Sequence, residues 1–267
     1  MASAPADRDC TAVWWGHSAA TIRLDGVQLV TDPVLRSHIG PLHWVGHRPA
    51  AEEVKETDVV LLSHLHRDHT DLPSLRRFGA RTTVLVPPGG RSTVRRRLRA
   101  AVAELPVGAA HRVGAVEVRS TFAEHAGGRG RRSGQVPAMG FLLLGSRAIY
   151  LAGDTDLFEG MRELGTPTAG HRLDLALLPV SGWGLNLGPG HLDPRRAAYA
   201  LTLLRPRMAI PVHWGRLRIP LLWRTRPGRY RTPATEFAEA ARVLAPRCRV
   251  LLPEPGQVVP VPATAPA

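Results

Sequence analysis

Short apolar runs, each followed by a histidine or an aspartate, constrain the fold of this chain more than any other feature. "DVVLL" leads to His64, "VEVRSTF" to His125, "AIYLAG" to Asp154 and "RMAIPV" to His213. Apolar runs of this length are typical of strands that are buried on both faces of a sheet. Each run therefore predicts a buried strand that carries a metal-seeking side chain at its end.

Helical segments with recognisable starts lie between these runs. Asp193-Pro194 places a capping residue before a proline at the first helical position, and Thr232-Pro233 repeats this pattern. Asp71 and Thr155 begin two shorter candidates, "SLRRF" and "LFEGMREL", and "RSTVRRRLRA" is interpreted as the exposed face of a helix. This alternation predicts an α/β fold with helices outside buried sheets.

The length and composition set the domain organisation that we expect. The chain has 267 residues, of which 44% are hydrophobic, and this is enough for a sizeable core. We expect a flexible N-terminus over residues 1–10, a single domain over 11–256 and a disordered Pro-rich tail over 257–267. Residues 126–138 and 215–233, which are rich in Gly, Pro and Arg, are expected to be irregular.

The sequence predicts a cytoplasmic protein. No apolar run approaches the roughly 18 residues that a membrane-spanning helix needs, and the start "MASAPADRDC" lacks a basic leader and an apolar stretch. Cys10 and Cys248 stand far apart and in no metal-binding pattern, so we expect two free thiols.

The charge balance is strongly basic, with 35 Lys and Arg against 22 Asp and Glu and a formal net charge of +13. Such an excess favours an anionic partner, for example a phosphorylated substrate, a nucleic acid or a membrane surface. A general preference for arginine on a solvated surface explains the excess equally well. Charge alone therefore decides nothing.

The segment "SHLHRDH" predicts a metal site. It offers His64, His66, Asp68 and His69 directly after a strand, where a turn can aim several side chains at one point. Imidazole and carboxylate ligands suit zinc, and also manganese or ferrous iron, and a set without cysteine is typical of a catalytic site that keeps a position for water. One ion cannot easily use four ligands in six residues, which indicates two ions.

With His125, Asp154 and His213, this segment resembles the ligand series of the metallo-β-lactamase-fold hydrolases, and the resemblance runs from about Trp14 to about Gly256. The resemblance implies a four-layer αββα sandwich with the site at its edge. It also implies seven metal ligands, with His64, His66 and His125 on one zinc ion, Asp68, His69 and His213 on the second, and Asp154 bridging the two.

A closer likeness is to the branch that holds N-acyl-phosphatidylethanolamine phospholipase D and the ascorbate-6-phosphate lactonase-like enzymes. It is carried by "WWGHSAATIRLDGVQLVTDPV", "GHLDPRRAAYAL" and "AIPVHWG". His191 lies in the second stretch, and the resemblance implies that it contacts substrate or donates a proton; the alternative is a loop histidine that stabilises the helix start. Ala126 after His125 and Arg216 after Gly215 depart from the phospholipase pattern and weaken the assignment of a lipid substrate.

These observations predict a zinc-dependent hydrolase that uses a two-metal-activated hydroxide. The substrate would be a phosphodiester, lactone or related ester of an anionic small molecule or lipid-like compound. Asp68 would be both a ligand and the acceptor of a hydrogen bond from the attacking water, and His191 would protonate the leaving group. The alternatives are a metal-dependent nuclease or RNA-processing enzyme, although no inserted RNA-holding domain is visible, and a metal-binding protein without catalysis.

Groups around the ligands are predicted with less specificity. Asp32, in "LVTDP", is the first candidate to orient a ligating histidine, with Ser63 and Thr155 as weaker candidates. His17 either lines the site or packs beneath it. The segment "RSHIGPLHWVGHRP", residues 36–49, forms either a wall of the substrate pocket or a surface loop.

Substrate contacts are predicted for three residues in the basic loops: Arg129, Arg216 and Trp223. Arginines mixed with aromatic and apolar residues suit lipid headgroups and therefore peripheral membrane contact, and they also suit single-stranded nucleic acid. Flexible, solvated loops are the alternative. The sequence leaves a homo-oligomer open.

Overall fold

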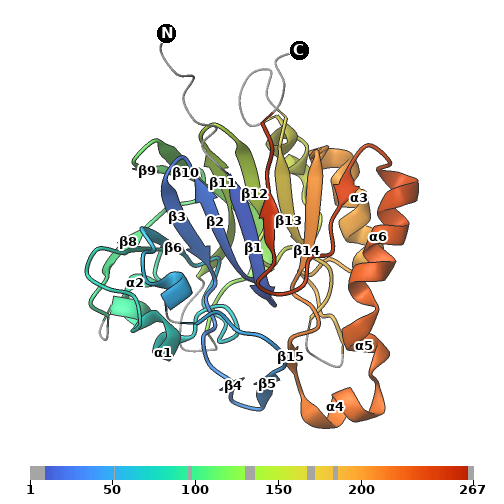
Figure 1. Ribbon diagram of the computed structural model, residues 1–267, viewed down its shortest axis with the longest axis horizontal. Coiled ribbons are helices and arrows are strands. Elements are labelled where there is room, and N and C mark those ends of the chain that lie inside the picture. The colour runs from blue at the N-terminus through green and yellow to red at the C-terminus, as the bar shows by residue number, and fades with distance from the viewer. Residues whose placement is uncertain are drawn as a thin grey trace.

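Two seven-stranded sheets pack face to face in the computed structural model, which describes residues 10–50, 52–95, 98–129, 136–166, 172–182 and 186–263 (Figure 1). The first sheet has the strand order β17 (Val258–Pro260), β1 (Thr11–Gly16), β2 (Ala19–Leu24), β3 (Val27–Thr31), β6 (Val59–Leu61), β7 (Thr83–Val86), β8 (Ala101–Glu104). The second has the order β16 (Arg249–Val250), β14 (Met208–Val212), β13 (Leu175–Pro179), β12 (Ala148–Leu151), β11 (Pro137–Leu144), β10 (Val116–Ala126), β9 (Ala110–Val113).

Helices cover the outer faces of both sheets. The first sheet is covered by the short α1 (Leu72–Leu75) and α2 (Arg91–Val94), and the second by α3 (Pro194–Leu204) and α6 (Pro233–Leu244). Short 3-10 turns span Glu52–Val54, Glu159–Met161 and Glu163–Gly165. A small third sheet, with the order β15 (Leu217–Arg218), β5 (Leu42–Trp44), β4 (His38–Ile39), lies at one end of the molecule near α4 (Pro220–Thr225), and α5 (Gly228–Arg231) follows (Figure 1).

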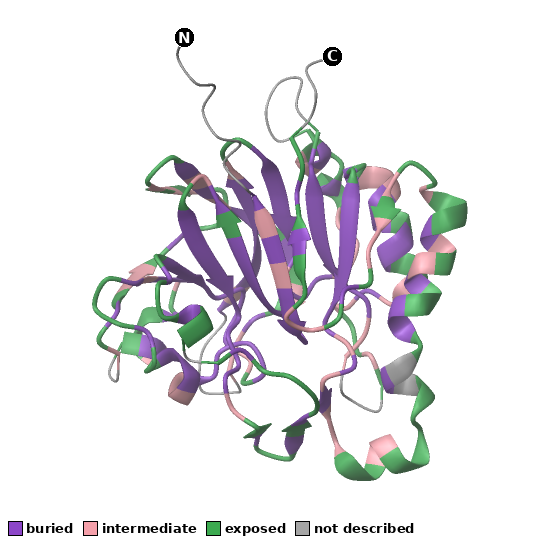
Figure 2. Ribbon diagram, in the orientation of Figure 1, coloured by how far each residue is buried: buried purple, intermediate pink, exposed green. Residues whose placement is uncertain are grey.

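Three apolar layers hold the two large sheets and their helices together, and a separate apolar cluster holds the small third sheet. The central strands are largely buried, whereas β8, β9 and β16 toward the sheet edges are not (Figure 2). The central layer lies between the two sheets and joins residues such as Trp14 and Ile22 to Phe141 and Ile149. A second layer lies between the second sheet and helices α3 and α6, and a third lies beneath α1 and α2. The predicted four-layer αββα sandwich is confirmed, with a thinner helical layer on the first sheet.

The pairing directions bring the strand ends that carry the predicted ligands to one edge. In the first sheet β1 and β3 are both antiparallel to β2, and β6 is parallel to β3. In the second sheet β10 and β12 are both antiparallel to β11, and β14 is linked to β12 through the parallel β13. Within each sheet, these strands therefore finish at the same edge, so the residues that follow them are brought together.

The helix starts predicted at Asp71, Asp193 and Thr232 are confirmed, whereas no helix begins at Thr155. Asp193 accepts a hydrogen bond from the backbone N–H of Arg196 at 2.8 Å, and Asp71 accepts one from Ser74 at 3.1 Å. Thr232 precedes α6 without a side-chain capping bond. "LFEGMREL" forms only 3-10 turns, and the described part of "RSTVRRRLRA" is helical only over the four residues of α2.

Two boundary expectations are wrong. The tail does not become irregular at residue 257, because β17 pairs with β1 at the sheet edge and Val259 and Val261 are buried. Prolines are tolerated there because an edge strand need not donate every backbone hydrogen bond. Cys10 is buried and belongs to the domain, whereas residues 1–9 lie outside the described part. The stretch 215–233 is not irregular, since it contains β15, α4 and α5.

Neither described cysteine forms a disulfide, as expected, and in the described part of the chain no helix is long and apolar enough to span a membrane. Burial raises the pKa of Cys10 to about 12 and that of Cys248 to about 12. Because the thiolate is the reactive form, both thiols should be inert near neutral pH.

We therefore expect that a disulfide reagent such as dithionitrobenzoate labels neither cysteine of the native protein at neutral pH. Both should react once the chain is unfolded in guanidinium chloride, because unfolding removes the desolvation that raises the two pKa values. Absorbance of the released thiolate checks this. Fast labelling of the native protein would contradict the described burial, and Cys10→Ser and Cys248→Ser variants would identify the exposed thiol.

Candidate metal centre

The loop after β6 delivers four of the predicted ligands. Its turn is closed by backbone hydrogen bonds from His69 and Thr70 to the carbonyl of His66, and the Thr70 hydroxyl donates to the carbonyl of His64 at 2.6 Å. Two further backbone bonds, Leu65 N–H to Gly127 O and Met139 N–H to Ser63 O, tie the loop to the second sheet. The loop is therefore fixed between the two sheets at their common edge.

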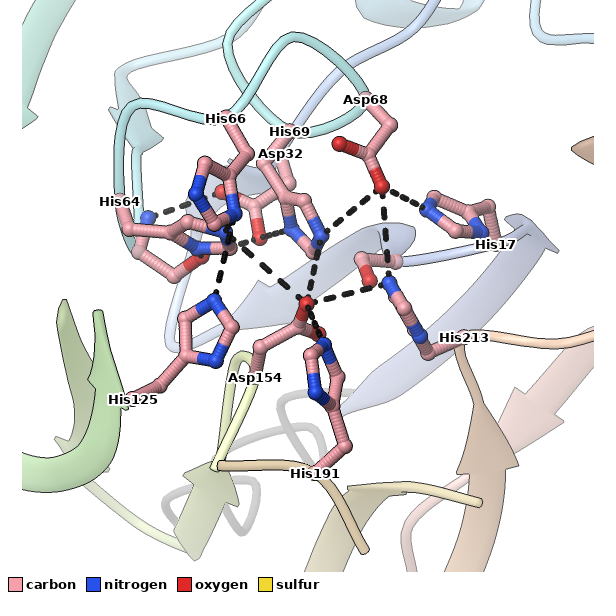
Figure 3. Close-up of polar contacts among 12 residues, drawn as sticks. His17, Asp32, His64, His66, Asp68, His69, His125, Asp154, His191 and His213 are labelled. Carbon is pink, nitrogen blue, oxygen red and sulfur yellow. Dashed lines mark hydrogen bonds and ion pairs between the residues drawn. The ribbon is translucent and has the colours of Figure 1, made fainter. Parts of the chain in front are cut away.

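The remaining predicted ligands arrive from the other strand ends. His125 is the second-to-last residue of β10, Asp154 follows β12 and His213 directly follows β14. Figure 3 shows that these side chains and those of the β6 loop point toward one centre, with the Asp154 carboxylate in the middle. The strand-end prediction is confirmed by this arrangement.

One group of donor atoms consists of three imidazoles: His64, His66 and His125. The Nε2 atom of His64 lies 2.9 Å from Nδ1 of His66, and Nε2 of His125 lies 3.2 Å from the same atom. Ligands about 2.0–2.1 Å from a tetrahedral zinc ion are separated by roughly 3.3 Å. Burial lowers the pKa of all three, that of His125 to about 4, so their lone pairs are available.

A second group lies around Asp68. Its Oδ2 atom is 3.5 Å from Nε2 of His69 and 3.6 Å from Nε2 of His213. Oδ2 of Asp154 lies 3.1 Å from Nε2 of His69, 3.2 Å from that of His213 and 3.9 Å from that of His64. Asp154 thus stands between the two groups, where the sequence predicted a bridging ligand.

The buried atoms of this cluster lack ordinary partners, which is the test of whether a metal fits. Nε2 of His69, Nε2 of His213 and Oδ1 of Asp154 are buried without a hydrogen-bond partner. An unsatisfied buried polar atom costs about 1–3 kcal/mol, and native proteins retain few of them. Cations shared between imidazole and carboxylate atoms satisfy all three, so the residues present fit a divalent metal pair.

Charges within the cluster keep the carboxylates ionised. Burial alone would raise the pKa of Asp68 and Asp154, but the neighbouring imidazoles, His69 for Asp68 and His213 for Asp154, hold both well below the usual range. Burial would lower the pKa of His69, but the carboxylates of Asp154, Asp68 and Asp32 raise it well above its ordinary value. The described side chains therefore present negative charge to a bound cation.

Residues behind the ligands fix their orientation. Asp32 accepts hydrogen bonds from the backbone N–H and hydroxyl of Ser63 at 2.8 and 2.7 Å, and its Oδ2 lies 2.9 Å from Nδ1 of His69. The predicted role of Asp32 toward a ligating histidine matches these contacts. His213 donates from Nδ1 to the carbonyl of Ser181 at 2.6 Å. The Ser63 hydroxyl lies 2.9 Å from Nδ1 of His64, which matches its predicted role toward a ligating histidine.

Backbone strain is concentrated around the site. His17, Asp32 and His213 have φ angles of 50°, 40° and 62°, values that residues other than glycine rarely adopt. Gly153 has φ 63°, and a Cβ atom there would lie 2.7 Å from Cβ of Ser63. Such strain is retained where the surrounding structure requires a defined side-chain position.

A cavity of about 550 Å³ opens beside the cluster. Its wall includes residues 39–42 of the β4–β5 hairpin, so the segment 36–49 does contribute to a pocket wall, although His38 and His43 themselves are exposed. Arg67 lines the cavity with an exposed side chain, and the sequence reasoning missed it. Its only signal was its position between two ligands of the motif.

The three residues that were predicted to contact substrate lie in different places relative to the cavity. Arg129 lines the cavity, although its guanidinium also donates to the carbonyl of Thr70 at 2.7 Å. Arg216 does not line it: its Cγ lies against Gly16, and Nη2 is 3.3 Å from Oε2 of Glu254. Trp223 of α4 also lies outside the cavity lining, with the Arg218 guanidinium 3.6 Å from its ring centroid. Substrate contact by Arg216 and Trp223 therefore stays a prediction that this cavity does not support.

His191 lies at the boundary of cluster and cavity. Its Nε2 is 3.6 Å from Oδ2 of Asp154, its Nδ1 donates to the carbonyl of Pro189 at 3.1 Å, and its side chain is 21% exposed. Burial would lower its pKa, but the Asp154 carboxylate outweighs burial and raises it. A partly exposed histidine at this place has access to a bound substrate.

Comparison with known proteins identifies the family. Residues 28–214 match the model of the beta-lactamase superfamily domain. The chain belongs to the beta-lactamase superfamily. A UPF0173 metal-dependent hydrolase of Symbiobacterium thermophilum is 31% identical over 202 residues, covering 75% of this chain and 82% of the relative. Another from Caldivirga maquilingensis is 28% identical over 264 residues, covering 93% and 97%. This superfamily member is therefore a metal-dependent hydrolase of the UPF0173 family.

Solved structures of the same fold agree with this membership. A metallo hydrolase of the archaeon Ignicoccus hospitalis has a TM-score of 0.72 and 24% identity over 96% of this chain and all of that chain. CmlA, a diiron β-hydroxylase from Streptomyces venezuelae, has a TM-score of 0.69 and 18% identity over 96% of this chain and 55% of its own length. At these identities the likeness shows the metallo-β-lactamase fold alone, and the closer likeness to the phospholipase D and lactonase branch stays a prediction.

The contacts of Asp32 predict the effect of its removal. In Asp32→Ala, His69 and Ser63 lose a common acceptor, so we expect metal affinity to fall by about 10–100-fold. Competition with a chromogenic chelator measures this affinity. Asp25→Ala is the matched control, because Asp25 also has a positive φ but pairs with the backbone N–H of Ser146 outside the centre. Equal affinities for the two variants would refute the role of Asp32.

Proposed function

We propose that this protein is a two-zinc hydrolase that cleaves a phosphodiester, lactone or related ester of an anionic substrate. The observation that carries the proposal is the convergence of seven imidazole and carboxylate side chains, three of them with unsatisfied buried atoms, beside a cavity of about 550 Å³. The absence of cysteine among the donors favours a catalytic over a structural zinc site. Iron would also accept this donor set, so the metal is part of the proposal.

The donor positions assign the chain's residues to two ions. His64, His66 and His125 would hold one, Asp68, His69 and His213 the other, and Asp154 would contact both. Two bound divalent ions supply a Lewis acid for the substrate oxygen and lower the pKa of water toward neutrality. Asp68 has the further role of accepting a hydrogen bond from the attacking water, because its carboxylate lines the cavity.

His191 is proposed as the proton donor to the leaving group. It lines the cavity and is more exposed than the buried ligands around it. The hydrogen bond from Nδ1 to Pro189 O leaves Nε2 directed at the cluster. General acid catalysis from such a position is typically worth about 10²–10⁴-fold in rate.

An anionic substrate with an apolar part fits the cavity lining. Arg67 and Arg129 stand near one another, since the charge of Arg67 contributes to lowering the pKa of Arg129, after the larger effect of burial. Ile39, Leu42 and Leu187 supply apolar surface. The branch likeness in the sequence supports a phosphodiester or a lactone as the bond cleaved. Membrane contact through α4, where Leu221 is 70% exposed, stays a prediction.

Metal content and turnover together test the function. Wild-type protein should bind about two metal ions per chain and hydrolyse bis(p-nitrophenyl) phosphate. Asp154→Asn should lose metal and at least about 10²-fold of the rate, because several kcal/mol of transition-state stabilisation depend on the ions. Elemental analysis and p-nitrophenol release measure these two quantities.

Asp156→Asn is the control for that experiment. Asp156 lies two residues after Asp154, but it pairs with Arg196 and lies outside the ligand groups. It should retain both metal and activity. A wild-type protein that binds no more than trace metal when zinc is supplied would overturn the two-zinc proposal. Full metal loading with no hydrolysis of phosphodiester or lactone substrates would overturn the proposed bond class.

The role of Arg67 is tested by substrate charge. Arg67→Ala should raise the KM of an anionic ester about tenfold and leave that of a neutral ester unchanged, because one charge-assisted contact is worth about 1.5–3 kcal/mol before solvent screening. Steady-state kinetics on matched esters measure the difference. Arg216→Ala should change neither KM, since Arg216 lies outside the cavity. An equal rise for both esters in Arg67→Ala would contradict charge recognition.

A further inference from the structure

His17 stands beside the metal centre but outside the superfamily's ligand series. It lies in the turn between β1 and β2, its side chain is only 2% exposed, and it points toward Asp68 (Figure 3). A buried histidine directed at a buried carboxylate needs a physical explanation, because both groups lose their hydration.

The contact between the two side chains is close and specific. Nε2 of His17 lies 2.9 Å from Oδ2 of Asp68, the same oxygen that faces Nε2 of His69 and of His213. The His17 ring centroid is 4.1 Å from that of His213. His17 therefore reaches the single carboxylate atom that the second metal would use.

The direction of the hydrogen bond follows from the chemistry of the partners. An ionised carboxylate only accepts, so the proton of this contact is on Nε2 of His17. A nitrogen that carries a proton has no lone pair for a metal ion. The geometry thus favours His17 as a donor to Asp68 over His17 as another ligand.

The backbone of His17 is also part of the site. Its carbonyl accepts hydrogen bonds from Nε1 of Trp14 at 2.9 Å and from the backbone N–H of His213 at 2.8 Å. Its φ of 50° is the conformation that combines these bonds with the inward side chain. One residue thereby contacts the main chain of one ligand and the side chain of another, across the two sheets.

We propose that His17 is a positioning residue, which holds the Asp68 carboxylate in its ligating orientation and thereby sets the affinity of the second metal. The proposal rests on the proposed function only in taking Asp68 as a ligand. Removing the donor takes away one of the contacts that hold the Asp68 carboxylate toward His69 and His213. Among the residues that the structure describes, His17 contacts Asp68, His69 and His213 but not His64, His66 or His125. The group of these three histidines should therefore keep its ion.

Three substitutions of His17 separate the hydrogen bond from folding. His17→Ala removes the donor. His17→Gln replaces it, because the glutamine Nε2 occupies nearly the position of the histidine Nε2 and donates, while an amide is a poor zinc ligand. His17→Asn also carries an amide and tolerates a positive φ well, but it is one methylene too short to reach Asp68. His111→Ala, in β9 and away from the centre, is the control for losing one histidine.

The measurement is stepwise metal affinity by chelator competition, with cobalt(II) absorption to report the ligand set and circular dichroism to confirm folding. We expect His17→Ala and His17→Asn to bind the first ion as wild type does and the second about 10–100-fold more weakly. His17→Gln should recover most of the second affinity with an unchanged cobalt spectrum. His111→Ala should bind both ions normally.

Other results would overturn the proposal. Wild-type affinity for both ions in His17→Ala would show that Asp68 needs no positioning. Failure of His17→Gln to recover affinity, together with a cobalt spectrum that indicates one nitrogen ligand fewer, would make His17 a ligand instead. Since these are metal-binding measurements, they stand even if no tested ester is hydrolysed, so failure of the proposed function is distinguished from failure of this proposal.

Discussion

The concentration of buried imidazoles and carboxylates at one edge of the sandwich is the constraint on which the rest of the structure depends. Nitrogen and oxygen atoms of different side chains face one another at short distances, for example 2.9 Å between His64 and His66 and 3.1 Å between His69 and Asp154. Several of these buried atoms have no hydrogen-bond partner. A protein core tolerates this only when a cation joins the atoms. The parallel strand ends, the tied β6 loop and the strained backbone at His213 all bring these atoms together.

Most of the imidazoles in the centre use one nitrogen for the cluster and the other for the protein. His64 contacts the Ser63 hydroxyl, His125 the carbonyl of Gly190 and His213 that of Ser181, while His69 faces Asp32. These contacts select tautomers and limit rotation of the rings. The side chains of the cluster are therefore held by the protein at their outer nitrogen atoms, which leaves the inner donor atoms directed at the centre.

The ligands and the layers were predictable from the sequence because their signals are local. An apolar run with a histidine or aspartate at its end defines both a strand and a site residue, as at His125 and His213. Substrate contacts depend instead on the backbone path of the loops, which the local sequence does not determine. Arg216 follows His213 closely in sequence, but positive φ angles at His213 and Gly215 turn the chain away from the cavity. The edge strand β17 was missed because Pro260 and the prolines around it are not typical of a strand. Its pairing with β1 is a long-range contact that the sequence pattern does not indicate.

The small β4–β5–β15 sheet places the cavity wall on a scaffold of its own. Its hairpin lines the cavity and, among the residues that the structure describes, pairs with Leu217–Arg218 alone. No predicted metal ligand lies within its strands. Part of the cavity wall is thus built on a piece of chain separate from the metal ligands, whereas Arg67 reaches the cavity from within the β6 loop. A change in the length or composition of this hairpin would therefore reshape the cavity and leave the residues that are proposed to hold the metals in place.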